Sequence, residues 1–433
     1  MEGPAPVTAP VDLKYTDAER SLASALDDIL AARSGSAGVI ARTEQPETYD
    51  VGLWKALASD IGIGGLLIPE ELGGAGASYR ELAAAAERFG AYVAPVPYLG
   101  SAVVATAAAM SAQSQAASAT ASGPAPAGAS AAARMFAAAR QRAAGTADAA
   151  SDAGTGTSHA TAAADLLRRL ADGTVTVALA VPVDMAPGAP FPVQARLSGT
   201  QPGDREDGTV RLRGTIRSVA DALPADLLLV PAEGVPNGLY LVEAAAAGVH
   251  RAPVTSLDMT RQLCDITLDG APARPIAVGA AAGVAVEAGL VAGAVILAAE
   301  QLGLAQRCLD MTVAYVKERR QFARQIGSFQ GLKHRLADLW ATIAQARAAS
   351  RYAAACLAAG DPDAPVALAL AKSACCEASV TAAQECVQMH GGIGFTWEHP
   401  AHLYLKRAKA ASVAFGTPGA HRAALADLVN LPA

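Results

Sequence analysis

The chain has 433 residues, long enough for more than one hydrophobic core, so we expect two or three domains. Hydrophobic residues make up 52% of it and aromatic residues only 4%, and alanine supplies much of the apolar share. This composition favours helices packed through small side chains over a β-sandwich. The formal net charge of -6 gives no basic footprint for nucleic acid, so no nucleic-acid partner is expected.

Cysteine usage and the N-terminus indicate an intracellular protein. The six cysteines form no CxxC pair, so we predict reduced thiols, with neither a disulfide framework nor a metal site. Residues 1–15 are polar and contain proline, without the cationic start and apolar core of a signal peptide. A cytoplasmic location is therefore expected.

The first group of elements, at about 16–112, has a helical pattern. Apolar residues recur at helical spacing in 22–32 and 51–61, and a further helix is predicted at 79–89. The loop at 68–76 is rich in glycine. No strand leads into a GxGxxG or P-loop pattern there, so we interpret its glycines as turn residues and not as a phosphate-binding loop.

Residues 111–161 are a low-complexity insertion of Ala, Ser, Thr, Gly and Gln. Such a composition buries little apolar surface per residue, and we predict a mobile loop or a poorly ordered segment, although alanine-rich pieces such as 131–142 favour helix. A short helix is predicted at 163–171, before Asp172 and Gly173. The N-terminal helical domain is therefore placed at 1–172.

The middle region, at 173–275, changes to a period of two. Alternating segments are separated by Gly, Pro, Asp and Asn, which is typical of antiparallel strands joined by turns. We predict an antiparallel β-barrel domain. Its strands are expected at 174–183, 209–219, 227–230, 238–242 and 264–268.

The helical period returns in the C-terminal region, at 276–433. The apolar stretch 276–299 is long enough to cross a bilayer, but it continues into a polar, periodic segment. A buried helix at the centre of a bundle explains both halves, so no membrane span is expected. We predict a C-terminal four-helix bundle, or one of five helices, and a chain that is mainly α with a β-domain. Its helices are expected at 280–319, 330–359, 364–390, 399–413 and 418–429.

Several segments resemble the acyl-CoA dehydrogenase family. The run YVKERRQF at 315–322, followed by QIGSFQ at 325–330, is similar to the family's signature region, where one long helix ends and the next begins. The run QMHGGIGF at 388–395 is similar to the second signature. The loop PEELGGAG at 69–76 and the segment LDMTR at 257–261 also have family counterparts. These segments occur in the family's order and at its spacing.

The resemblance implies FAD-dependent α,β-desaturation of an acyl-CoA thioester, in which a base removes the α-proton and flavin accepts the β-hydrogen as hydride. It implies that Arg319 contacts the pyrophosphate of an FAD bound mainly by a neighbouring subunit, because a guanidinium matches two phosphate oxygens. Arg319 could equally be the cationic end of a helix, and the glycine pair at 391–392 a helix cap. The other positions that match cofactor contacts are Gln321, Phe322, Phe329, Gln330, Gln388, Gly391, Gly392 and Thr417.

The chain departs from the family at the catalytic base. The family's usual glutamate position is occupied by Phe415, which cannot accept a proton. A minority of members place the base on the first long helix of the bundle, and the matching position here is Gly293. Glu287 and Glu300 lie about two helical turns away on the same predicted helix, so a displaced base on either remains an alternative. The catalytic residue is left unknown.

The flavin-ring contacts depart as well. The two family loops that hydrogen-bond the ring correspond to 180–184 and 218–220, and neither retains the expected polar and aromatic groups. We therefore expect the non-base-bearing subunit of a heteromeric complex. Its expected partners are a second acyl-CoA dehydrogenase-like subunit, an acyl-CoA with a bulky acyl group such as a sterol side chain, and an electron-transfer flavoprotein as acceptor. The alternatives are a homo-oligomeric dehydrogenase with a displaced glutamate and a flavin-free assembly scaffold.

Overall fold

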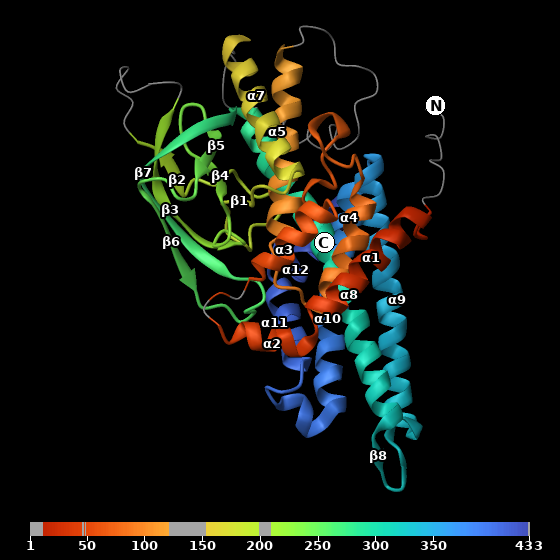
Figure 1. Ribbon diagram of the computed structural model, residues 1–433. Helices are drawn as coiled ribbons and strands as arrows, with labels where there is room; N and C mark the ends of the chain where they lie inside the picture. Colours follow the sequence, from red (N-terminus) through yellow and green to blue (C-terminus); the bar gives the residue numbers. More distant parts are fainter. Residues whose placement is uncertain (1–11, 46, 48, 121–152, 199–208, 432–433) are drawn as a thin grey trace, which may run out of the picture.

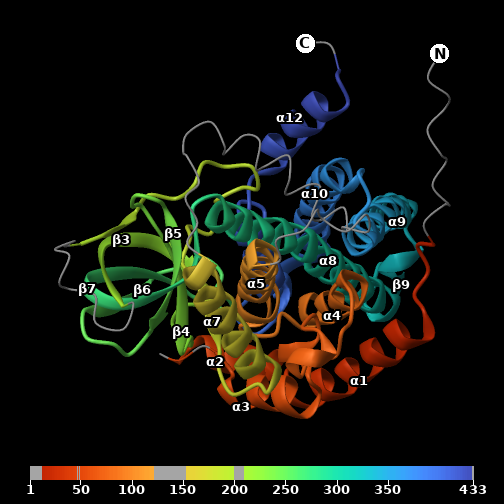
Figure 2. The same ribbon diagram turned by 90° about the horizontal axis from the view of Figure 1, so that it is seen from above.

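The computed structural model describes residues 12–45, 47, 49–120, 153–198 and 209–431. Helices from both ends of the chain pack together, and the middle of the chain forms a sheet at their side (Figure 1). Seen from above, helix α8 crosses the centre of the helical part, between α4 on one side and α10 on the other (Figure 2). The fold is mainly α with a β-domain, as predicted.

The N-terminal helices follow the predicted pattern, with boundaries set by local capping. The side chain of Thr16 accepts a hydrogen bond from the main chain of Glu19, whose carboxylate reaches back to the N–H of Thr16, which fixes where the first helix begins. The predicted helix at 51–61 is a short α-helix followed by a π-helical turn at Ala56–Asp60. These helices are α1 (Asp17–Arg33), α2 (Ser36–Thr43), α3 (Val51–Lys55), α4 (Tyr79–Tyr92), α5 (Thr106–Thr120) and α7 (Ala153–Ala171).

The predicted insertion at 111–161 is helical at both edges. Helix α5 continues to Thr120, and α7 begins at Ala153, ten residues before the predicted start at 163. Alanine has the highest helix propensity. The buried alanines of α5 pack in the core. An alanine-rich segment can therefore continue a helix when one face of that helix packs against the rest of the protein. Residues 121–152, with the alanine-rich piece at 131–142, lie outside the described residues.

The middle region forms one seven-stranded sheet in the order β1-β4-β5-β7-β3-β2, with β6 paired to β7. The expectation of a closed antiparallel barrel was wrong. Strand β1 pairs with β4 in parallel, and only an isolated bridge from Arg196 to Glu233 joins β2 to the end of β4 in the described part of the chain. The strands are β1 (Val177–Leu179), β2 (Ala195–Leu197), β3 (Val210–Ala220), β4 (Leu227–Ala232), β5 (Gly238–Glu243), β6 (Val249–Val254) and β7 (Leu263–Val278).

The long strand β7 explains why the sheet bends without closing. Its residues 263–273 pair with β3, 263–268 also pair with β6 on the other side, and 274–278 pair with β5. Register shifts interrupt both the β3 and the β5 pairings, and such irregularities bend a strand. Strands β2 and β6 were not predicted, because β2 has only three residues and β6 (VHRAPV) has no buried residue, so neither gives a long apolar alternation.

The C-terminal region is a helical bundle built around α8. Helices α4 and α8 cross closely at two glycines: a Cβ at Gly90 would lie 1.9 Å from the carbonyl oxygen of Glu300, and one at Gly303 would lie 1.8 Å from that of Glu87. No other residue fits at such a backbone approach. The helices are α8 (Ala280–Glu318), α9 (Gln330–Ala359), α10 (Ala364–His390), α11 (Ala401–Ala411) and α12 (Pro418–Leu428).

Two helical stretches are long and apolar enough to cross a membrane, Ala280–Glu318 and Ala364–Phe395. Their most apolar windows are 78% and 67% buried inside the fold. The apolar character of α8 is therefore used in packing against α4, α9 and α10, as expected for the central helix of a bundle.

Candidate functional site

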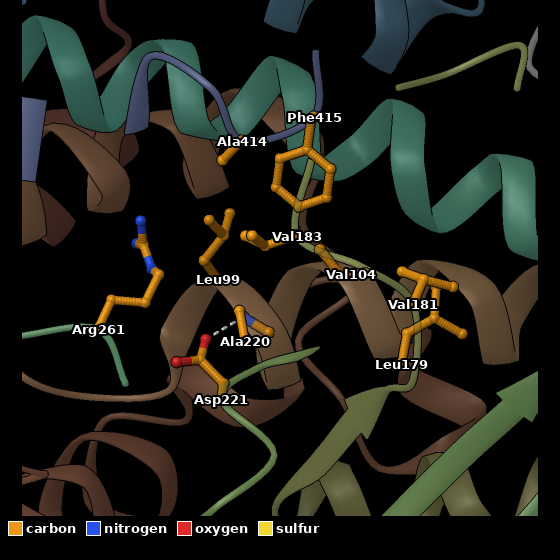
Figure 3. Close-up of a pocket in the computed structure, with 11 residues that line it drawn as sticks. Leu99, Val104, Leu179, Val181, Val183, Ala220, Asp221, Arg261, Ala414 and Phe415 are labelled. Atoms are coloured by element: carbon orange, nitrogen blue, oxygen red, sulfur yellow. Dashed lines mark hydrogen bonds between the residues drawn. The ribbon is translucent and has the colours of Figure 1, made fainter. Parts of the chain in front are cut away.

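A small pocket lies where the sheet, the N-terminal helices and the end of the bundle meet (Figure 3). Val181 and Val183 line it from the loop after β1, Ala220 from the end of β3, and Phe415 from the turn between α11 and α12. The pocket therefore brings together all three segments in which the sequence departs from the family. Its volume is about 30 Å³, which is room for one water molecule.

The ring of Phe415 occupies the space beside α8. A Cβ added at Gly293 would lie 2.7 Å from Cζ of Phe415, closer than real Cβ contacts come. The two positions at which family members carry the base are therefore in direct contact, and the aromatic ring fills the space between them. The sequence indicated both positions but not that they touch.

The main chain fixes Phe415 in a left-handed conformation, with φ of 53°. Its N–H donates to the carbonyl of Val183 at 2.8 Å, and its own carbonyl lies 2.8 Å from Nε2 of His421. His421 is buried, and burial lowers its pKa, so the neutral ring is favoured and donates its N–H to that carbonyl. These two hydrogen bonds offset the strain of a positive φ in a residue with a side chain.

Glu300, one candidate for a displaced base, is held in a buried ionic network. Its Oε2 lies 2.6 Å from Nη2 of Arg261, and its Oε1 lies 2.9 Å from Nε of Arg407. Burial raises the pKa of Glu300, but the two arginines outweigh it and the pKa is lowered overall. Arg407 also bonds Asp258 at 3.2 Å. A carboxylate held in this way is a poor proton acceptor and joins the bundle to the β-domain.

Glu287, the other candidate, is partly exposed on α8. Its carboxylate accepts hydrogen bonds from the main-chain N–H of Gly188 at 2.9 and 3.0 Å. Neither Glu287 nor Glu300 lines the pocket beside Phe415. The geometry thus offers no support for a displaced base on either residue.

Two charged residues at the pocket wall were not predicted as site residues. Asp221 directly follows residues 218–220, the second segment that corresponds to the family's flavin-ring contacts. Burial raises the pKa of Asp221 despite the nearby Arg261. Its carboxylate accepts hydrogen bonds from the hydroxyl of Tyr49 and from the N–H of Gly100, the latter at 2.9 Å. In Figure 3, Arg261 and Asp221 lie at the left, with Leu99 and Ala220 beside Asp221, and Phe415, Val181 and Leu179 lie to the right. Both oxygens of Asp221 are therefore committed to the protein's own donors.

The predicted pyrophosphate contacts lie at the far end of the bundle. Arg319 caps the C-terminus of α8 and is exposed. It leads into a hairpin of β8 (Arg320–Gln321) and β9 (Arg324–Gln325), seen at the tip of the molecule in Figure 1. Phe322, at the turn of this hairpin, is 86% exposed and has a φ of 53°. Its ring meets that of Phe329 edge to face, with centroids 6.0 Å apart.

The second signature lies beside the first. Gln388 is exposed near the end of α10, and Gly391 and Gly392 open the exposed 3-10 turn Gly391–Phe395, where Gly391 has a φ of 63°. The rings of Tyr315, four residues before Arg319, and His390 stack with centroids 4.4 Å apart. The structure thus brings Arg319, Gln321, Gln388 and the glycine pair to one end of the bundle. Gln330, also exposed, begins α9 at the same end.

Thr417 is separated from this group. It is the N-cap of α12, accepts from the N–H of Ala420 at 3.2 Å, and lies two residues after Phe415. Helix α8 runs without interruption between Gly293 and the end of the helix at Glu318, which at 1.5 Å per residue is about 38 Å. One flavin nucleotide does not span the pocket and the signature loops of a single chain.

The chain therefore fits one part of FAD, the pyrophosphate, and does not fit the other, the flavin ring. Exposed Arg319, Gln388 and Gly391 present a cation, an amide and an approachable main chain, which suits an anionic pyrophosphate. The pocket beside Phe415 does not fit a flavin ring, because its volume is about 30 Å³ and its walls are apolar where ring contacts are expected. Among the described residues no group of three or more metal-ligating side chains occurs, and all six cysteines are buried and unpaired.

This helix–sheet–helix architecture brings the two signature segments together at one end of the helical bundle. The pattern of the acyl-CoA dehydrogenase N-terminal domain matches residues 16–122, and that of the C-terminal domain matches 282–429. The chain belongs to the acyl-CoA dehydrogenase family, as the motifs predicted. This is a family of flavoprotein oxidoreductases that typically bind FAD.

Relatives match nearly the whole chain. Acyl-CoA dehydrogenase IpdE2 of Mycobacterium tuberculosis is 32% identical over 390 residues, which cover 90% of each chain. The structure of a Tcur3481–Tcur3483 steroid acyl-CoA dehydrogenase variant is 27% identical with a TM-score of 0.70, covering 96% of this chain and 98% of that one. The ChsE4–ChsE5 complex from Mycobacterium tuberculosis is 26% identical with a TM-score of 0.72, covering 98% and 100%.

Proposed function

We propose that this chain is the non-base-bearing subunit of a heteromeric, FAD-dependent acyl-CoA dehydrogenase that introduces an α,β double bond into an acyl-CoA thioester. The observation that carries the proposal is the ring of Phe415, which fills the space beside Gly293 and leaves a pocket of about 30 Å³. Neither a thioester nor a flavin ring has room there.

Removal of an α-proton requires a group that can hold the proton. Asp221, which lines the pocket, accepts from Tyr49 and Gly100, and Glu300 is paired with two arginines. We therefore assign the base to the partner subunit, which would also hold the flavin ring. In this chain Arg319, Gln321 and Gln388 would contact the pyrophosphate of the partner's FAD, and Gly391 and Gly392 would allow main-chain approach to it.

The relatives support a two-subunit enzyme and suggest the kind of substrate. One similar structure is a complex of two differently named chains, ChsE4 and ChsE5, and another is described as a steroid dehydrogenase with two named components. By analogy we propose a bulky acyl group such as a sterol side chain. An electron-transfer flavoprotein as acceptor and a cytoplasmic location complete the proposal.

The test is co-expression with family members of the same genome that carry glutamate at the position matching Phe415. The expected complex has visible flavin absorbance and desaturates an acyl-CoA, while this chain alone is colourless and inactive. The partner's glutamate-to-glutamine variant should keep flavin but lose turnover. Stoichiometric flavin and activity in this chain alone would refute the proposal.

A further inference from the structure

A lysine and a cysteine lie in contact inside the bundle, one helical turn apart on α10. Lys372 and Cys376 are both fully buried, and Nζ of Lys372 donates to Sγ of Cys376 at 3.0 Å. The side-chain amide of Gln301 on α8 brackets the same sulfur, with its Nε2 at 3.2 Å and its Oε1 at 3.3 Å. The lysine nitrogen and the cysteine sulfur are therefore held against each other by their surroundings.

Capping of α11 explains only one of the contacts of Lys372. Its Nζ also donates to the carbonyl oxygen of Ala411, the last residue of α11, at 2.9 Å, and a cation at a helix C-terminus is a common structural device. A fully buried lysine is usually paired with a carboxylate. Within the described part of the chain, Lys372 is in no ion pair, and the thiol of Cys376 takes the place of the carboxylate. The capping role does not account for this sulfur.

We propose that Lys372 and Cys376 form a modification site, at which an oxidant joins Nζ to Sγ through a single oxygen atom. With dioxygen as the oxidant, the neutral amine loses one N–H hydrogen and the thiol loses its S–H hydrogen. One oxygen atom forms the N–O and O–S bonds, and the other leaves as water. Nitrogen and sulfur each give up two electrons, and dioxygen takes up all four. Two molecules of hydrogen peroxide serve equally and leave three of water.

The contact geometry favours this product over the usual products of cysteine oxidation. Cysteines react where a cationic group lies against the sulfur, and the first oxygen added to Cys376 would lie beside Nζ of Lys372. A direct N–S bond would require the two atoms, now 3.0 Å apart, to move much closer, whereas a bridging oxygen leaves them near this distance. The link is expected to be reversible by thiols, and it does not depend on the proposed partner subunit.

Small neutral oxidants reach the pair through the end of the bundle that α12 covers. This helix packs against α10 at the outer side of the bundle (Figure 2) and is the last helix of the described chain. Its Arg422 bonds Ser373 and Glu377, which directly follow Lys372 and Cys376 on α10. Terminal elements open locally at a low free-energy cost. Opening of α12 therefore uncovers this stretch of α10 without global unfolding.

The test is peptide mapping of the full chain after treatment with hydrogen peroxide. Free thiols are alkylated in denaturant, and the chain is digested with trypsin, which cleaves after an unmodified lysine. The expected product is a peptide of residues 352–406 that stays joined across Lys372 and carries one more oxygen atom and two fewer hydrogen atoms. Dithiothreitol should reverse this mass shift and restore cleavage after Lys372.

Two neighbouring cysteines provide a matched pair of variants, because Cys375 and Cys376 are both buried on α10. Cys376→Ser should abolish the joined peptide and Cys375→Ser should retain it, with thermal unfolding as the check that both fold. Lys372→Arg keeps a cation beside the sulfur but should leave Cys376 to form sulfinic or sulfonic acid.

Three outcomes would overturn the inference. The first is complete cleavage after Lys372 in the peroxide-treated chain, whatever the oxidation state of Cys376. The second is a joined peptide without the added oxygen atom, since that product is a direct N–S bond. The third is an unchanged joined peptide in Cys376→Ser. None of these results bears on the proposed function, which is tested by assembly and flavin content.

Discussion

The main-chain N–H of Phe415 donates to the carbonyl oxygen of Val183 at 2.8 Å. This bond ties the position of the family's base to the first of the two loops that correspond to its flavin-ring contacts. The two departures in the sequence are therefore one structural unit. The left-handed φ of Phe415 directs its ring into the pocket, and that loop supplies an apolar wall around it.

The contact between Phe415 and Gly293 predicts a strong energetic coupling. Phe415→Ala should lower the free energy of unfolding by about 3–5 kcal/mol, because it leaves a cavity in the core. Gly293→Ala should lower it by about 1–3 kcal/mol, because the new methyl group meets the Phe415 ring at 2.7 Å and Val104 Cγ2 at 2.9 Å. In the double variant the cost of Gly293→Ala should fall by about 1 kcal/mol or more, with the remainder due to Val104.

Denaturant unfolding of the four proteins in this cycle measures the coupling. Gly283→Ala is the matched control, since it lies on the same helix and a Cβ there meets nothing within 4 Å. It should be neutral or stabilising by up to about 1 kcal/mol. Additive effects of the Phe415 and Gly293 substitutions would show that the ring does not fill this space.

His421 should stabilise the Phe415 turn in a pH-dependent way. His421→Leu removes the N–H donated to the Phe415 carbonyl and should lower the free energy of unfolding by about 1 kcal/mol above pH 7. Because burial lowers the folded-state pKa of His421 below 6.5, its contribution is present above that value and is lost as pH falls through the folded pKa. The difference between the two proteins, measured by urea unfolding, should therefore shrink toward pH 5. His421→Gln retains a hydrogen-bond donor, so its free energy of unfolding should lie between those of the unmodified protein and His421→Leu.

The ionic network around Glu300 predicts a different pH window. Glu300→Gln should destabilise the protein by about 3–5 kcal/mol at pH 7, because Arg261 and Arg407 stay buried without their shared counter-charge. The pKa of Glu300 is lowered below its ordinary 4.5, so the stabilisation is full above about pH 4.5 and is lost as pH falls through the folded value. Unfolding curves from pH 7 to 3 should show the gap between the two proteins closing. The control is Glu398→Gln, at an exposed glutamate. A difference in the free energy of unfolding between the unmodified protein and Glu300→Gln that does not change with pH would contradict the assigned ion pairs.

The sequence predicted most helices because their signals are local. The period of 3.6, the turn after Asp172 and the proline at the start of α12 fix elements without knowledge of the rest of the fold. The sheet was harder, since pairing depends on distant segments. The parallel β1–β4 pair joins Val177 to Leu227 across fifty residues, and no local pattern encodes it. The edges of the alanine-rich insertion became helical through packing, which composition alone does not show.

For the site, the motifs identified the positions in the sequence but not the residues that these positions contact in the fold. The family resemblance indicated Phe415 and Gly293 separately, and only the crossing of the 415 turn over α8 shows that they touch. Asp221 carried no signal beyond its place directly after the second ring loop. Arg261 was visible in the motif LDMTR, yet its role as a buried partner of Glu300 depends on how the β-domain docks on the bundle.

The assignment of the base to a partner subunit predicts which carboxylate controls turnover. In the assembled complex, Glu287→Gln should change turnover less than twofold, because the Glu287 carboxylate accepts from Gly188 and does not line the pocket. Glu300→Gln, assayed where the complex remains folded, should lower the amount of complex and not the turnover per flavin. The glutamine variant of the partner's glutamate should lose at least about a hundredfold in turnover with flavin still bound, since a positioned general base contributes that much. Stopped-flow reduction of the flavin by acyl-CoA separates these cases. Loss of flavin reduction in Glu287→Gln, with flavin content and assembly unchanged, would move the base into this chain.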